Sequence, residues 1–193
     1  MSATLRSAPE GRAITPNMDV RAIFLVGHMG AGKSSVGRAL SAQMNWPFED
    51  LDDRIEQSEG SSIEEIFREK GESEFRRLEH AVLRKILEEL HGPPRVIALG
   101  GGAFVQPENA RLLKQPGYVS AFLDGTAEEF FNRCRRQAVQ RPLVVDSKQF
   151  SDLYEKRRKF YESATLRSDT TGRSIEDIAS DLARELAKLV PTK

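Results

Sequence analysis

Residues Gly27–Ser34 read GHMGAGKS, the spacing G-x-x-x-x-G-K-S, and this stretch decides how the whole chain is interpreted. An apolar run, Ala22–Val26, precedes it, and a helical pattern from Val36 to Met44 follows it. A strand, a glycine loop and a helix in this order form the context in which the motif holds nucleotide phosphates. We therefore expect the chain to bind a nucleoside triphosphate.

The composition of this loop suits phosphate binding. Its glycines let backbone N–H groups point at phosphate oxygens, and the N-terminus of the following helix adds positive potential. Lys33 is expected to reach the β- and γ-phosphates, and the Ser34 hydroxyl is expected to bind Mg²⁺. The residues expected to bind ATP here are Gly27, Met29, Gly30, Ala31, Gly32, Lys33, Ser34 and Ser35.

The overall composition is that of an ordinary globular protein. The chain has 193 residues, of which 39% are hydrophobic and 30% charged, and its formal net charge is zero. A neutral chain gives no global electrostatic reason to expect a nucleic acid or a membrane as partner. Cys134 is the single cysteine, so no intrachain disulfide can form, and we expect a cytoplasmic protein that is monomeric. No apolar run is long enough to span a bilayer.

Strand-like and helix-like patterns alternate along the chain. The expected strands are Arg21–Val26, Pro47–Asp50, Arg95–Leu99, Tyr118–Leu123 and Leu166–Asp169. The expected helices are Ser34–Met44, Ser62–Lys70, Glu72–Leu90, Pro107–Lys114, Ala127–Arg136, Ser151–Ala164 and Ile175–Val190. Such alternation predicts an α/β protein with a parallel sheet and helices on both faces.

The domain organisation follows from the same reading. Residues 20–193 are expected to form one domain, because no shift in composition marks a second one. Residues 1–19 are rich in Ser, Ala, Arg and Pro and are expected to be a disordered tail. The tail lacks the apolar stretch of a signal peptide; a transit peptide stays open, although Glu10 and Asp19 count against it.

Two carboxylates follow the short second strand. Asp50 and Asp52 are one residue apart, so both side chains point to one side if the strand stays extended there. Ligands of open α/β sheets bind at the carboxyl ends of the strands, which places this pair near the loop Gly27–Ser34. One carboxylate would then order the water shell of Mg²⁺ and the other would orient an attacking hydroxyl. Taken alone, the pair is better explained as a solvated acidic loop.

Two further features favour a ligand-binding role for Asp50 and Asp52 over a solvated loop. Gly100, Gly101 and Gly102 follow the apolar strand Val96–Leu99, where they offer backbone N–H groups and let a ligand approach closely. Arg76 lies on a predicted long helix. Without the motif Gly27–Ser34, Gly100–Gly102 could equally be a flexible turn, and Arg76 would be interpreted as an exposed charge.

Taken together, five ordered motifs resemble the shikimate kinase family. They are Gly27–Ser34, Phe48–Glu56 (F-x-D-x-D-x-x-I-E), Phe75–Glu79 (F-R-x-x-E), Gly100–Ala103 and Arg141–Leu143 (R-P-L). The resemblance implies a P-loop NTPase fold like that of nucleoside monophosphate kinases, with a five-stranded parallel sheet and a mobile lid. It also implies that ATP phosphorylates the 3-hydroxyl of shikimate, with Mg²⁺, on the route to chorismate and the aromatic amino acids.

The resemblance assigns roles residue by residue. Asp52 would hold the ring hydroxyls and help to remove a proton, and Asp50 would join Ser34 near the metal. Arg76 and the loop Gly100–Gly102 would bind shikimate. Arg141 would reach the transferring phosphate from a lid at about residues 138–150, while the substrate-binding region spans about residues 50–90. The expected catalytic residues are therefore Lys33, Asp52 and Arg141, of which Arg141 also contacts ATP.

Two matches are looser. The family's second carboxylate-binding arginine corresponds to Arg157, four residues before Tyr161, with Lys156 and Arg158 as alternatives. The arginine that stacks on adenine should lie about seven residues before the lid motif, where this chain has Cys134. A shift of one residue would supply either Arg133 or Arg135, and the sequence leaves both open. His28 is interpreted as a variable loop position rather than a general base.

Other functional classes were weighed. A gluconate kinase also has a P-loop and a lid, but an acyclic polyol would not call for Asp52, Arg76 and the triple glycine together. A GTPase-like switch needs an N-K-x-D string, which does not occur in the sequence. A degenerate kinase that serves as an interaction module is disfavoured, because every motif position is filled. No zinc site is expected from the three scattered histidines.

Overall fold

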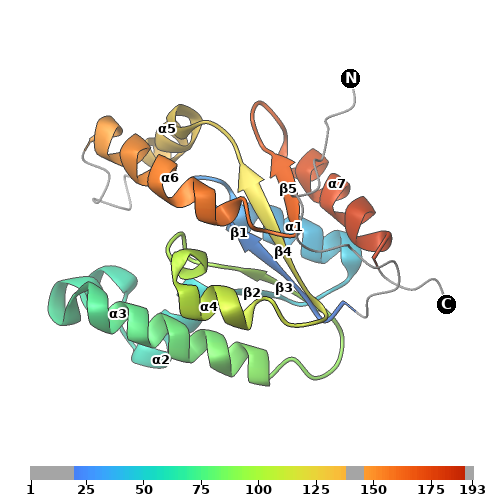
Figure 1. Ribbon diagram of the computed structural model, residues 1–193, viewed down its shortest axis with the longest axis horizontal. Helices are drawn as coiled ribbons and strands as arrows, with labels where there is room; N and C mark the ends of the chain where they lie inside the picture. Colours follow the sequence, from blue (N-terminus) through green and yellow to red (C-terminus); the bar gives the residue numbers. More distant parts are fainter. Residues whose placement is uncertain (1–19, 138–145, 190–193) are drawn as a thin grey trace.

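The computed structural model describes residues 20–137 and 146–189, which build a five-stranded, all-parallel sheet in the order β2-β3-β1-β4-β5 (Figure 1). The strands are β1 (Ala22–Val26), β2 (Phe48–Asp50), β3 (Arg95–Ala98), β4 (Tyr118–Asp124) and β5 (Leu166–Asp169). Ala22 lies opposite both Arg95 and Tyr118, so β1 is the central strand. The five strands expected from the sequence are confirmed, with ends that differ by one residue at most.

Helices cover both faces of the sheet (Figure 1). One face carries α1 (Lys33–Met44) and α7 (Ile175–Ala187), and the other carries α2 (Leu51–Glu59), α3 (Ile63–Glu88) and α4 (Pro107–Leu112). Helices α5 (Ala127–Gln137) and α6 (Ser147–Tyr161) lie at the carboxyl ends of the strands, and a 3₁₀ turn, η1 (Ala103–Val105), follows β3. The predicted two-sided α/β architecture is confirmed.

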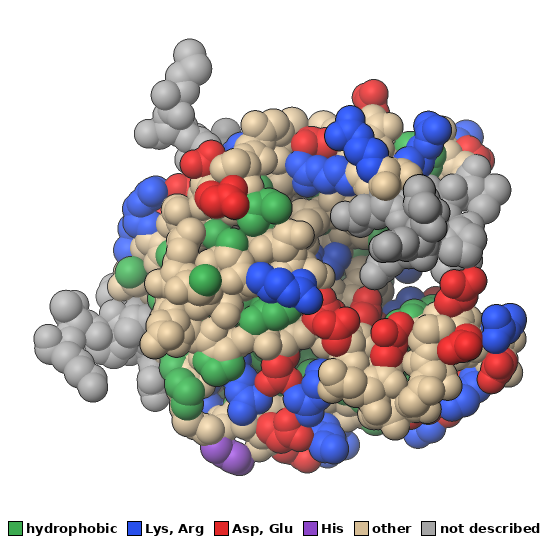
Figure 2. All heavy atoms as spheres, turned by 180° about the vertical axis from the view of Figure 1, so that it is seen from behind, with side chains coloured by type: hydrophobic (Ala, Val, Ile, Leu, Met, Phe, Trp, Pro, Cys, Tyr) green, Lys and Arg blue, Asp and Glu red, His purple; other side chains and the backbone are tan. Residues whose placement is uncertain are grey.

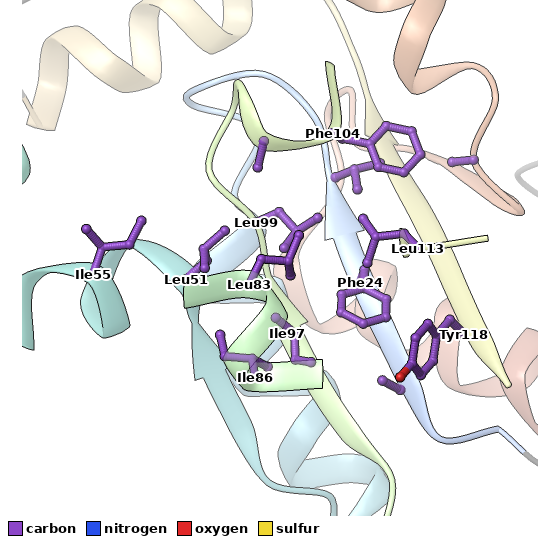
Figure 3. Close-up of a cluster of buried hydrophobic side chains, with 14 of the residues drawn as sticks. Phe24, Leu51, Ile55, Leu83, Ile86, Ile97, Leu99, Phe104, Leu113 and Tyr118 are labelled. Atoms are coloured by element: carbon purple, nitrogen blue, oxygen red, sulfur yellow. The ribbon is translucent and has the colours of Figure 1, made fainter. Parts of the chain in front are cut away.

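The central strands are apolar on both sides because each face of the sheet is covered. In β1, Phe24 and Val26 join the cluster under α2, α3 and α4, whereas Ile23 and Leu25 join the cluster under α1 and α7. This follows from the alternation of side chains along a strand. Figure 3 shows the first cluster, in which Phe24 meets the edge of Tyr118 with ring centroids 5.4 Å apart.

The structure corrects the expected extended course through Asp52. The chain turns into helix α2 directly after Asp50, whose carboxylate accepts a hydrogen bond from the Asp52 backbone N–H and so caps that helix. Asp50 is extended, but Asp52 lies in the first helical turn, so the two side chains do not share a strand face. The sequence does contain a signal for the start of α2, because an Asp followed by acidic residues is typical of a helix N-terminus.

Other helices also differ from their expected ends, by up to four residues. Within α3 the two predicted helices, Ser62–Lys70 and Glu72–Leu90, are separated by a kink at Gly71, whose φ of 79° and ψ of 172° are not helical, as the sequence predicted. Helix α6 starts at Ser147, four residues earlier than expected, so residues 147–150 of the expected lid form its first turn. Residues 138–145 of that lid, including Arg141, and the expected tail at residues 1–19 lie outside the described residues.

No helix in the described part of the chain is long and apolar enough to cross a membrane.

Candidate active site

The loop between β1 and α1 is tightly packed against its surroundings, and two of its glycines are required by that packing. Gly27 has a φ of 146° and Gly30 a φ of 80°, conformations that side chains disfavour. A β-carbon on Gly27 would lie 2.8 Å from the carbonyl oxygen of Leu123, and one on Gly30 would overlap the carbonyl of Phe130. The loop therefore keeps a path that only glycine permits at these two positions.

Lys33 and Ser34 begin helix α1 and already make polar contacts. The ammonium of Lys33 donates hydrogen bonds to the carbonyl oxygens of Gly27 (3.0 Å) and His28 (2.9 Å). The hydroxyl of Ser34 donates to Oδ2 of Asp50 at 2.6 Å. Strand β2 thus brings Asp50 to the phosphate-binding loop, as the sequence predicted. Of the other residues expected to bind ATP, Met29 and Ser35 are exposed and Ala31 is buried.

The oxygen pair of Ser34 and Asp50 fits Mg²⁺. A hydroxyl and a carboxylate are hard oxygen donors, the kind that Mg²⁺ accepts in small number beside phosphate oxygens. Within residues 20–137 and 146–189, no group of three or more His, Cys, Asp or Glu side chains is arranged to hold a metal ion. The site therefore suits a metal that arrives with a nucleotide rather than one in an all-protein cage.

The glycines after β3 lie where several functional residues converge. A β-carbon on Gly100 would lie 2.8 Å from Oδ1 of Asp52 and 3.1 Å from Oε1 of Glu79. On Gly102 it would lie 2.5 Å from both terminal nitrogens of Arg76. On Gly101 it would lie 3.5 Å from the backbone nitrogen of Met29. Side chains at Gly100 and Gly102 would displace the groups around them, which explains two of the three glycines, whereas a β-carbon on Gly101 would make only ordinary contacts.

Arg76 is held in place by a buried carboxylate. Its Nη1 atom donates to both oxygens of Glu79, at 3.0 and 2.9 Å, and Nη2 lies 3.3 Å from Glu72. Its Nε atom is buried without a hydrogen-bond partner. Buried donors are nearly always satisfied, so this orphan N–H indicates a place for an acceptor from a ligand.

Glu79 is fully buried between charged groups. Burial raises the pKa of its carboxyl, and the Asp52 carboxylate adds to this; Arg76 and Arg157 oppose it. The carboxylates of Asp52 and Glu79 and the guanidinium groups of Arg76 and Arg157 therefore lie close to one another. They surround Gly100–Gly102, which is called the glycine loop below. Glu79 ends the motif Phe75–Glu79 but is not among the site residues predicted from the sequence, although its position one turn after Arg76 is a usable signal.

Arg157 faces this group of charges from helix α6. Its Nη1 atom would lie 3.8 Å from a β-carbon on Gly101. One turn later, the hydroxyl of Tyr161 donates to the carbonyl of Gly101. Burial raises the pKa of Tyr161 to about 12, although the neighbouring Arg157 opposes the shift. Arg158 instead binds Asp124 at 3.0 Å, and Lys156 is exposed. Of the three alternatives, Arg157 is the one beside the glycine loop.

His28 is the second residue whose setting the sequence did not reveal. Its side chain is fully buried, and both ring nitrogens lack a hydrogen-bond partner. The ring meets Phe150 edge-on at 4.7 Å and lies 5.3 Å from the ring of Tyr154. Burial, helped by the charges of Arg157 and Lys33, lowers its pKa to about 3. The imidazole is thus neutral at neutral pH.

A cavity of about 330 Å³ lies along helix α5, lined by Thr126, Glu128, Glu129, Asn132, Arg133 and Arg136. Arg133 donates to the carbonyl of Thr170, after β5, at 3.3 Å and also binds Glu129. Arg135 is exposed, with its guanidinium 5.9 Å from the ring centroid of Phe131. Of these two arginines, Arg133 lines the cavity.

The surface is hollowed between the part that carries α5 and α6 and the part that carries α2 and α3 (Figure 2). Acidic and basic side chains both occur around this hollow. Its floor corresponds to the carboxyl ends of the strands, where the phosphate-binding loop and the glycine loop lie (Figure 1).

A sequence model of the family "Shikimate kinase" matches residues 29–187. The chain belongs to this family. Curated shikimate kinases from Geobacter metallireducens and Persephonella marina are 40% and 39% identical to it, over 88% and 84% of this chain and 93% and 97% of theirs. The residues matched by the family model include the site motifs from Met29 to Glu79 and at Gly100–Gly102.

Solved structures agree with this membership. A shikimate kinase from Acinetobacter baumannii, solved in complex with shikimate, is 33% identical, with a TM-score of 0.72 over 88% of this chain and 92% of that one. A gluconokinase from Sinorhizobium meliloti (20% identical, TM-score 0.56) and a deoxyadenosine kinase from M. mycoides (12%, 0.60) share the fold alone. The P-loop kinase fold predicted from the sequence is confirmed.

Proposed function

We propose that this member of the family transfers the γ-phosphoryl group of ATP to the 3-hydroxyl of shikimate. The observation that carries the proposal is the setting of Arg76, whose Nε is buried without a hydrogen-bond partner and whose terminal nitrogens lie against Gly102. A planar guanidinium with an unpaired donor beside a glycine loop is suited to a carboxylate. Arg157 supplies a second positive charge for the same carboxylate, and Asp52 supplies an acceptor for ring hydroxyls.

The nucleotide side of the proposal rests on the loop Gly27–Ser34. Its backbone N–H groups and Lys33 would hold the phosphates of ATP, and Ser34 and Asp50 would hold Mg²⁺. When bound, the metal would supply positive charge that neutralises the phosphate oxygens of the nucleotide. The cavity along α5 would take the adenine base beside Arg133, whose guanidinium is suited to stacking on a π-system.

The reaction then needs little from the protein beyond positioning and charge. The 3-hydroxyl oxygen of shikimate attacks the γ-phosphorus, its proton passes to the Asp52 carboxylate, and the bond to the bridging oxygen of ADP breaks. Lys33 stabilises the negative charge that develops on the phosphoryl oxygens. Arg141 is proposed to add to this from the segment before α6, and closure there would exclude water as a competing acceptor.

The biological setting follows from this chemistry. Shikimate 3-phosphate would feed the route to chorismate and the aromatic amino acids. We infer that the chain acts as a monomer in the cytoplasm, without a nucleic acid or membrane partner. Its zero net charge gives no electrostatic reason for a nucleic acid or membrane partner, and its single cysteine is in keeping with a reducing compartment.

The decisive experiment is a coupled assay of ADP release with shikimate, quinate, gluconate and buffer alone, with and without Mg²⁺. ATP turnover is expected to require both shikimate and a divalent cation. A higher kcat/KM with gluconate or quinate than with shikimate would overturn the substrate assignment.

Lys33→Ala provides the control for the nucleotide side. Loss of this charge from the transition state should reduce kcat/KM on the order of 10³-fold, with the fold intact by circular dichroism. Activity within tenfold of the parent would contradict the proposed role of the loop.

A further inference from the structure

The carboxyl end of β4 carries a buried carboxylate, Asp124, that is only 5% exposed. Arg158 of α6 binds it through Nη2 (3.0 Å) and Nε (3.3 Å), and the Tyr154 hydroxyl, also on α6, donates to it. Arg167 of β5 donates to the same carboxylate through Nε at 2.9 Å. Asp124 therefore joins α6 to the sheet and to its edge strand.

This carboxylate stays ionised despite its burial. Burial by itself raises its pKa, but the hydrogen bonds from Arg158, Tyr154 and Arg167 outweigh burial and hold the pKa below its usual value. A buried ionised group is kept only when it is well bonded, and the loss of one partner is costly. The connection is therefore strong enough to fix the elements that it joins.

The two partners on α6 determine how that helix is rotated about its axis. Tyr154 and Arg158 are four residues apart, so they lie on one face of the helix, one turn from each other. Arg157 and Tyr161 form a second pair four residues apart, and that pair lies beside Gly101. When the first face is fixed on Asp124, the second is fixed toward the glycine loop.

We propose that Asp124 is a positioning residue for the acid-binding side of the active site. It holds Tyr154 and Arg158 and thereby fixes the rotation of α6 at which Arg157 meets the substrate carboxylate. The inference rests on the proposed function, in which Arg157 binds shikimate, and it assigns to Asp124 a role in substrate affinity in addition to stability.

Arg158 and Arg167 offer a matched pair of variants. Both bind the same carboxylate and their side chains are similarly exposed, at 32% and 38%, but only Arg158 lies on α6. Arg158→Met is expected to raise the KM for shikimate about tenfold with the KM for ATP nearly unchanged. Arg167→Met is expected to change both by less than about twofold, although both variants lose thermal stability. Equal effects of the two on the KM for shikimate would overturn the proposal.

Asp124→Asn separates positioning from direct binding by Arg158. The variant keeps the charge of Arg158 but weakens its attachment, so the KM for shikimate should again rise about tenfold. If Arg158 itself bound the substrate, its release would leave that KM unchanged or lower it. In combination with Arg157→Met, Asp124→Asn should add little further loss, because both act through the same contact. Full additivity of the two losses contradicts the proposal.

The same set distinguishes this inference from the proposed function. If Arg157→Met leaves the KM for shikimate unchanged, the proposed role of Arg157 fails, whatever Asp124 does. If Arg157→Met raises that KM while Asp124→Asn and Arg158→Met do not, only the positioning role fails. Should Asp124→Asn not fold, the comparison of Arg158→Met with Arg167→Met still decides the question.

Discussion

At the scale of single residues, glycines in this site are explained by the neighbouring groups that a side chain would displace. Gly102 is a glycine because the guanidinium of Arg76 lies where its β-carbon would be, and Gly100 leaves room for Asp52 and Glu79. The sequence could predict Lys33, Asp52, Arg76 and the triple glycine, because motif and spacing identify them. It favoured Arg157 over Arg158 only by its spacing to Tyr161, and it could not predict the burial of His28, because that burial depends on contacts between distant segments.

Arg76→Lys should damage the use of shikimate far more than that of ATP. Lysine keeps the charge but loses the planar pair of donors, so kcat/KM for shikimate should fall by about 1.5–3 kcal/mol, roughly ten- to a hundredfold. Arg77→Lys is the control, because Arg77 is exposed and binds only Glu74 among the described hydrogen bonds, as expected from the sequence. Equal losses at the two positions, measured by steady-state kinetics, would place the carboxylate clamp on the wrong residue.

His28→Phe should change how stability depends on pH. The buried imidazole has a pKa of about 3, against 6.5 in the unfolded chain, so unfolding takes up a proton between these values. The stability of the parent therefore falls as pH decreases from 6.5, and the variant lacks this contribution. Between pH 6.5 and 5 the parent should lose about 1–2 kcal/mol more than the variant in urea titrations. Parallel losses would show that His28 finds a partner in solution.

Secondary-structure elements were predictable where one periodicity dominates and less so where two segments meet. The strands and α7 follow from apolar runs and helical spacing. Helix α2 was missed because its acidic start, Asp50–Asp53, resembles a solvated loop. The two predicted helices within α3 meet at a kink at Gly71, whose φ of 79° is not helical.

Gly71→Ala tests this reading of α3. A β-carbon there would meet nothing within 4 Å, so the cost is backbone strain alone, about 1–3 kcal/mol of stability. In a regular helix the same change would instead stabilise by about 1 kcal/mol. Ser73→Ala, at an exposed helical position two residues later, should stay within about 0.5 kcal/mol of the parent. Stabilisation by Gly71→Ala in chemical denaturation would mean that the residue is helical in solution.

At the scale of the whole molecule, one sheet supports two apolar clusters and one site. Strand β1 contributes to both clusters and ends in the phosphate-binding loop, so the fold and the nucleotide site share a strand. The surface in Figure 2 carries acidic and basic side chains interspersed, in keeping with a net charge of zero. The sequence predicted this architecture because alternation of strand and helix leaves few other arrangements.

Unfolding should occur in a single transition, because the two clusters share β1, β3 and β4. Trp46 is the only tryptophan, and it packs against the cluster under α1 and α7. Its fluorescence should therefore follow the same urea curve as far-ultraviolet circular dichroism, which reports on every helix. Separate midpoints for the two signals would show that the two sides of the sheet unfold independently, against the expectation of one domain.

The contacts within the phosphate-binding loop have a consequence for product departure. Lys33 is bonded to the carbonyls of Gly27 and His28, and Ser34 is bonded to Asp50. An arriving nucleotide must replace these bonds, and they re-form when ADP leaves, so the loop competes with its own ligand. In many enzymes the release of product limits the turnover rate. We therefore expect these internal hydrogen bonds to lower the affinity for ADP, to shorten the time for which it stays bound and so to increase turnover.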